Sequence, residues 1–226
     1  MNKDKMLTNA LLSYSKNLTL RAAVSLIPYA GGAIEVLLSG GATRIQNQRV
    51  EIALKALKNE MDKANDEQVN KEYFSSEEFY DDFNLFLEKA LKTKSQQKIM
   101  SYARILKSKS IEKIKSMDLT QLINSIADLS ENELIILQKM YHYTIDKEKI
   151  ALKNNGAPMA TDFNATLVRN LVDERCQLSI DYDYILIRLE KQGFVKEDVG
   201  TYAGYSGGSY FITNATRVLF SNLEDK

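Results

Sequence analysis

Histidine and cysteine are the side chains that most often carry proton transfer, nucleophilic attack or metal binding. This chain of 226 residues has one of each, His142 and Cys176, and they fall on different predicted helices. The sequence contains no metal-ligand spacing, no recognisable serine–histidine–carboxylate set and no phosphate-binding glycine loop followed by Lys-Ser/Thr. It therefore predicts a protein that is not an enzyme, with no catalytic residue, no metal site and no cofactor.

The remaining residues of chemical interest have structural explanations. The pairs Glu77–Glu78 and Asp81–Asp82 fall at a predicted helix start, where the helix dipole favours negative charge. His142 lies between two tyrosines, as a packed or surface residue would. No strand precedes Gly31–Gly32 or Gly40–Gly41, so they form no dinucleotide fingerprint. Catalysis by carboxylates alone stays open, but no residue points to it.

Composition indicates a globular protein without a global electrostatic field. Apolar residues make up 44% of the chain, charged residues 27%, and the formal net charge is zero. One cysteine excludes an intrachain disulfide and fits a reducing compartment. The first residues do not read as a cleavable signal. We expect a cytoplasmic protein, with peripheral association at the inner membrane as a further hypothesis.

The longest apolar passage, Leu18–Ala42, combines features that a plain core helix avoids. Its notable residues are Pro28, Gly31, Gly32, Ala33, Gly40 and Gly41. Arg21 and Glu35 leave thirteen uncharged residues between them, short of the roughly 20 that a membrane span needs. One interpretation is a buried helical hairpin, and the other is a conditionally exposed element that is released into lipid. Small residues suit close helix packing in both environments.

From about residue 43 to 128 the pattern predicts a helical bundle. The first long helix carries an apolar stripe at Val50, Leu54, Leu57, Met61 and Ala64, and a capping box is predicted at Ser75–Glu78. Glu60–Glu88 is strongly acidic, and Lys89–Lys115 is strongly basic. One interpretation is that adjacent antiparallel helices complement each other's charge or that the lysines merely solvate a face. The other is that the basic segment grips phosphates or anionic headgroups. We favour the first interpretation.

The second half predicts an α+β domain. Ser130 and Glu133 match a capping box on a helix to about Tyr143, and Asp162 is the expected cap of another helix. A helix then ends in the run Leu189-Glu190-Lys191-Gln192-Gly193-Phe194-Val195, where glycine is a natural helix stop. Strands at 195–199 and 209–213 follow, with a tip at 200–208 and a closing helix over 213–222.

This order of elements and the glycine-terminated run resemble a winged-helix domain over about Leu129–Leu223. The resemblance implies that the helix before Gly193 is the recognition helix and that the hairpin is the wing. The fold class is then mainly α, with a helical bundle over residues 1–128 and a winged-helix-like domain over 129–226.

The predicted recognition helix departs from a DNA reader. Asp181 and Asp183 stand at its start, where carboxylates repel phosphates, and the tip GTYAGYSGG has no basic residue. Tyrosine-rich, glycine-containing surfaces suit protein contacts, although ordinary half-buried packing explains the tyrosines equally well. The candidate partner-binding residues are Tyr182, Tyr184, Arg188, Tyr202 and Tyr205.

More faintly, the N-terminal half resembles uncharacterised bacterial proteins and membrane-acting effectors of antiphage immunity that carry glycine-rich apolar helices. The sequence-based hypothesis is a non-enzymatic effector or adaptor that acts at anionic membranes and binds a protein partner or itself. The alternative is a winged-helix, DNA-binding transcriptional regulator. We favour this alternative less, and nucleic acid is accordingly the less favoured partner.

Overall fold

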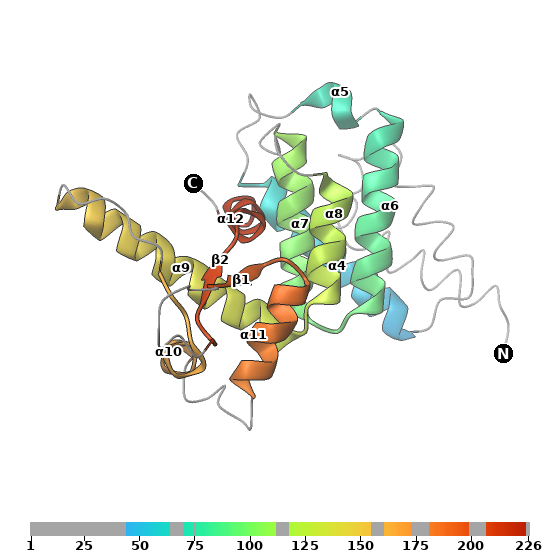
Figure 1. The fold of residues 1–226 in the computed structure, drawn as a ribbon. Coiled ribbons are helices and arrows are strands. Elements are labelled where there is room, and N and C mark those ends of the chain that lie inside the picture. The colour runs from blue at the N-terminus through green and yellow to red at the C-terminus, as the bar shows by residue number, and fades with distance from the viewer. Residues whose placement is uncertain are drawn as a thin grey trace, which may run out of the picture. The chain divides into compact units, whose positions relative to one another are not determined.

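A computed structural model describes residues 44–63, 70–74, 76–111, 118–154, 161–172, 181–198 and 207–224. The chain divides into two compact units, Met1–Asp128 and Leu129–Lys226. The described residues are mainly helical, with one small antiparallel sheet (Figure 1). The passage Leu18–Ala42 lies outside the described residues.

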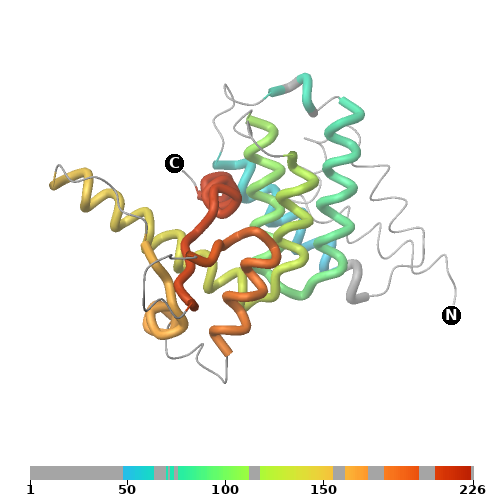
Figure 2. Tube along the Cα trace, viewed as in Figure 1, coloured from blue at the N-terminus to red at the C-terminus, as the bar shows by residue number. Residues whose placement is uncertain are grey.

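Unit 1 is an assembly of helices around α7. Its described helices are α4 (Arg44–Met61), α5 (Lys71–Phe74), α6 (Glu77–Lys92), α7 (Gln96–Ser110) and α8 (Leu119–Asp128). Helix α7 contacts α4, α6 and α8. Figure 2 shows α6, α7 and α8 running side by side. None of the described helices is long and apolar enough to cross a membrane.

Three members of the predicted α4 stripe and one apolar face each of α6, α7 and α8 form the core of unit 1. The buried members are Val50, Leu54, Leu57, Phe79, Phe83, Phe86, Leu87, Ala90, Ile99, Tyr102, Ala103, Leu106, Leu122, Ile123 and Ile126. Because the α4 stripe is buried against helices of the same chain, Val50, Leu54 and Leu57 are not available for self-association.

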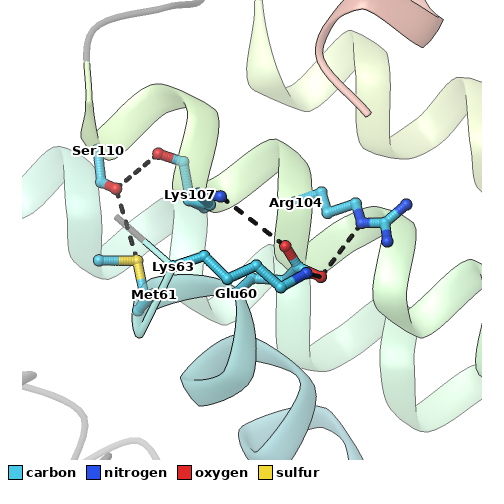
Figure 3. A network of polar contacts seen from close by, with 6 residues as sticks. All are labelled: Glu60, Met61, Lys63, Arg104, Lys107 and Ser110. Atoms are coloured by element: carbon cyan, nitrogen blue, oxygen red, sulfur yellow. Dashed lines mark hydrogen bonds and ion pairs between the residues drawn. The ribbon is translucent and has the colours of Figure 1, made fainter. Parts of the chain in front are cut away.

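A buried carboxylate joins α4 to α7. Glu60 is 2% exposed, and three cations surround it (Figure 3). Its Oε1 lies 2.8 Å from Lys63 Nζ and 3.2 Å from Arg104 Nε, while Oε2 lies 3.9 Å from Lys107 Nζ. The Lys107 side chain is itself nearly buried. A desolvated charge is tolerated only with opposite charge beside it, so this cluster fixes the contact between the two helices.

A second polar cluster joins α6 to α7. Asp82 is buried, accepts a 2.7 Å hydrogen bond from the Tyr73 hydroxyl and lies 2.9 Å from Lys109 Nζ, which also pairs with Glu78. Burial and the bond to Asp82 raise the pKa of Tyr73 above its usual range. Burial lowers the pKa of Lys109, but hydrogen bonds to Glu78 and Asp82 outweigh it and raise that pKa. The acidic and basic segments thus complement each other here, as we favoured from the sequence.

Unit 2 combines helices with a hairpin. Its described elements are α9 (Glu131–Lys153), α10 (Ala165–Leu171), α11 (Tyr182–Lys191), β1 (Val195–Glu197), β2 (Tyr210–Ile212) and α12 (Asn214–Ser221). Strands β1 and β2 are antiparallel, with Val195 opposite Ile212 and Glu197 opposite Tyr210. Phe163 adds an antiparallel bridge on β2, because it exchanges both backbone hydrogen bonds with Tyr210.

Three predicted boundaries in the chain were wrong. Helix α9 runs ten residues past Tyr143, because its last turns are rich in strong helix formers but carry no apolar stripe that periodicity could detect. Asn164, not Asp162, caps α10, because the Phe163 bridge keeps the backbone extended. Ser76, not Ser75, caps α6, accepting from Phe79 N at 3.2 Å. The Ser130–Glu133 capping box is present as predicted.

Gly193 ends α11 as predicted. Its φ of +80° is left-handed, the conformation that stops a helix at low cost only with glycine. Gly193 N donates to Glu190 O at 2.8 Å and Phe194 N donates to Leu189 O at 2.9 Å, which is the hydrogen-bond pair of a Schellman motif. The chain then enters β1 directly.

We expect Glu60→Gln to destabilise the folded chain by about 3 kcal/mol, because it removes the buried negative charge that Lys63, Arg104 and the nearly buried Lys107 surround. The measurement is urea unfolding of the full chain followed by circular dichroism. Glu51→Gln is the matched control on the same helix. Its exposed pair with Lys55 should be worth no more than about 0.5 kcal/mol. Equal effects of the two substitutions would contradict a structural role for the buried cluster.

Candidate functional site

Helix α11 presents one face to solvent and buries the other. Ile185, Leu186 and Leu189 are buried in unit 2. The exposed face, called here the α11 face, consists of Asp183, Tyr184, Ile187, Arg188 and Lys191. Tyr184 is 57% and Ile187 42% exposed, so two large apolar side chains lie one turn apart on a face that unit 2 leaves uncovered.

The start of α11 is closed by its own cap. Asp181 Oδ1 accepts a 3.0 Å hydrogen bond from Tyr184 N. A carboxylate here satisfies a free backbone N–H and complements the positive end of the helix dipole. One of the backbone donors that a phosphate could use at a helix start is therefore already bonded to Asp181.

The two predicted tyrosines of α11 have different environments. Tyr184 is exposed, but Tyr182 is 4% exposed and lies beneath the guanidinium of Arg169, whose carbon is 5.5 Å from the ring centre. The Tyr182 hydroxyl is buried without a hydrogen-bond partner in the described part of the chain. Half-buried packing, the alternative reading of these tyrosines, fits Tyr182, whereas Tyr184 belongs to the accessible surface.

Arg188 forms an ion pair with the buried carboxylate of Glu133. Its Nε lies 2.8 Å from Oε1 of Glu133, which is 1% exposed, but the N–H is not aligned for a hydrogen bond. The other oxygen of Glu133 accepts from Ser130 N at 2.6 Å in the capping box. The Arg188 guanidinium also lies 6.0 Å from the Tyr184 ring centre. Its charge is therefore partly neutralised inside unit 2, and its position on the α11 face is fixed.

The hairpin is tied back to α11 and α12. The Glu190 carboxylate accepts from Glu197 N at 2.9 Å, and the Glu197 carboxylate accepts from Gly208 N at 2.8 Å. The Phe194 carbonyl accepts from the backbone N–H of Thr213 and from the hydroxyl of the fully buried Thr216. These bonds set the hairpin against the end of α11. Tyr202 and Tyr205 lie outside the described residues.

Helix α12 is fixed to α9 by aromatic stacking and ion pairs. The Tyr141 and Phe220 rings stack at 5.2 Å, and Arg217 makes two hydrogen bonds to Glu148. The hydrogen bonds between Arg217 and Glu148 lower the pKa of Glu148 and raise the pKa of Arg217. Burial, followed by the Glu224 carboxylate, raises the pKa of Tyr141. The facing surfaces of α9 and α12 are therefore covered by contacts within unit 2.

The residues of chemical interest do not converge in the described structure. His142 is exposed on α9, and its Nδ1 lies 3.2 Å from Glu224 Oε1. Among the described residues, no group of three or more histidine, cysteine, aspartate or glutamate side chains could hold a metal ion. Cys176 and the six residues selected from Leu18–Ala42 lie outside the described part.

No protein family, no curated protein and no solved structure matches this chain. The site must therefore be interpreted from its own contacts.

Sequence reasoning missed two members of the site, Ile187 and Glu133. Ile187 ends the apolar run Tyr184–Ile187, and no role was predicted for it from the sequence. Its position, three residues after Tyr184 and opposite Ile185, was the signal that it is exposed. Glu133 was recognised as a capping residue, but no local pattern indicates its pairing with Arg188, which lies 55 positions later in the chain.

We expect Glu133→Gln to cost about 1 kcal/mol, because glutamine can still accept from Ser130 N but no longer offsets the partly exposed Arg188 charge. Glu133→Ala should cost about 1 kcal/mol more, because the capping bond is also lost. Urea unfolding of the full chain measures both differences. Arg188→Met should abolish most of the cost of Glu133→Gln in a double-mutant cycle. Additive effects would show that the pair has no energetic coupling.

Proposed function

We propose that residues 129–226 form a winged-helix module that binds protein rather than DNA, within a non-enzymatic effector or adaptor. The order of elements supports the winged-helix part of this proposal. Helix α9 is followed by the extended Phe163, α10, α11 and the β1–β2 hairpin. Phe163 adds an isolated antiparallel bridge beside β2, and the turn at Gly193 leads from the proposed recognition helix to the proposed first wing strand.

The observation that carries the binding mode is the exposure of Tyr184 and Ile187 on α11. An aromatic and an aliphatic side chain with an arginine beside them is the composition of a protein-interface centre. A helix that reads DNA instead presents donors to base edges and to phosphates. On α11 an aspartate occupies the cap, a second aspartate follows it, and Glu133 offsets the charge of Arg188.

Basic residues do occur near this face. Lys191 and Arg169 are exposed, and a DNA-binding regulator could use them for phosphate contacts. Lys191 stands at the last turn of α11, and Arg169 of α10 lies over the ring of Tyr182, beside the first turn that carries Asp183. This distribution favours a partner with mixed charge over a uniformly anionic backbone.

A photoreactive amino acid at Ile187 tests the proposal in living cells. Position 80 is the matched control, because Tyr80 on α6 has the same 42% exposure. We expect protease-sensitive adducts from position 187 and none from position 80. Nuclease-sensitive adducts from position 187, together with a sequence enriched from a random DNA duplex pool and lost on Tyr184→Ala, would establish the DNA-binding alternative instead.

The membrane part of the proposed function rests on the sequence of Leu18–Ala42 alone. We expect the full chain to release dye from anionic liposomes, and Ala33→Asp to reduce release more than tenfold. A carboxylate in a bilayer costs about 3 kcal/mol. Asn17→Asp, which adds the same charge outside the apolar passage, is the control. If the unaltered chain neither binds nor permeabilises these liposomes, even with its partner or trigger present, the passage is a packing element and the membrane role is wrong.

A further inference from the structure

The α11 face has opposite charges at its two ends. Asp183 lies in the first turn of the helix, and Arg188 and Lys191 lie in the last turn. This order complements the dipole of the helix itself. It also makes the α11 face complementary to the same face of a second chain that runs in the opposite direction. An antiparallel copy brings the acidic end of one helix against the basic end of the other. A parallel copy would place like charges together.

The spacing of these residues fits a two-fold axis at Ile187. Asp183 and Lys191 are each four residues from Ile187, which is about 6 Å along the helix axis in either direction. In an antiparallel pair centred there, Asp183 faces Lys191 of the second copy, twice by symmetry. The exposed ring of Tyr184 then lies near the basic end of the second copy, where cation–π contact is favourable.

We propose that the partner of the α11 face is a second copy of this chain, packed antiparallel through α11 about a two-fold axis at Ile187. This inference rests on the proposed function, since it names the protein that the α11 face binds. A two-fold contact is self-complementary by construction, so one face of mixed charge suffices for both copies. The face of a ten-residue helix is smaller than the roughly 800 Å² per partner of a standard interface, so the pairing is weak and concentration-dependent.

Disulfide trapping detects such a pairing despite its weakness. Ile187→Cys in a Cys176→Ser background places one thiol of each copy at the axis, where close approach of the helices permits a disulfide. Ile150→Cys in the same background is the control, because Ile150 is also exposed, on α9. We expect cross-linking in a glutathione buffer to be about tenfold faster for Ile187→Cys. Equal rates would overturn the proposal.

Charge reversal then tests the antiparallel register. Asp183→Lys or Lys191→Asp, each added to the trapping variant, creates two like-charge contacts per dimer and should slow its cross-linking about tenfold. Mixing the two single-reversal proteins, one of them isotope-labelled, restores both opposite-charge contacts. We expect mass spectrometry to find mixed dimers well beyond their statistical share. Because the same two proteins fail alone and succeed together, misfolding cannot produce this pattern, and a statistical mixture would overturn the proposal.

The outcomes separate this inference from the proposed function. Adducts from position 187 to another protein, with no preferred self-cross-linking, overturn the self-pairing and leave the protein-binding function in place. Sequence-specific DNA binding that depends on Tyr184 overturns both. Self-adducts at position 187 in cells, together with rescue in the mixture, support both.

Discussion

The geometry of unit 2 depends on the left-handed turn at Gly193. A helix that continued through this residue could not place β1 beside β2, because the Schellman hydrogen bonds redirect the chain at Phe194. A side chain at Gly193 would meet no atom within 4 Å, so the requirement for glycine comes from its backbone angle and not from crowding. The Phe194 carbonyl then binds the start of α12 through Thr213 and Thr216. One corner therefore sets the directions of α11, the hairpin and the last helix.

Buried carboxylates hold the helices of each unit in register. In unit 1, Glu60 joins α4 to α7 and Asp82 joins α6 to α7. In unit 2, Glu133 caps α9 and faces Arg188 of α11. Apolar faces tolerate small slips of one helix along another, whereas a buried charge must meet its partner. These pairs specify the arrangement more than they add to its stability.

The two faces of α11 have different environments, one buried in unit 2 and one exposed. The buried face supplies packing, and Glu133 beneath it fixes Arg188 at the surface. The exposed side chains of this face are thus carried by a helix whose opposite face is packed into unit 2. A rigid face loses little conformational entropy on binding, which suits weak contacts that depend on shape and charge order.

The sequence by itself determined the helical character, the apolar faces of unit 1, the Ser130–Glu133 cap and the stop at Gly193. Each of these depends on residues within one or two turns of each other, so local periodicity and capping chemistry are sufficient to find them. The tertiary structure decided which charges meet, that Tyr182 is buried while Tyr184 and Ile187 are exposed, and that Phe163 pairs with β2. Those outcomes depend on contacts between residues tens of positions apart, and no local pattern encodes which distant side chain will cover a given face.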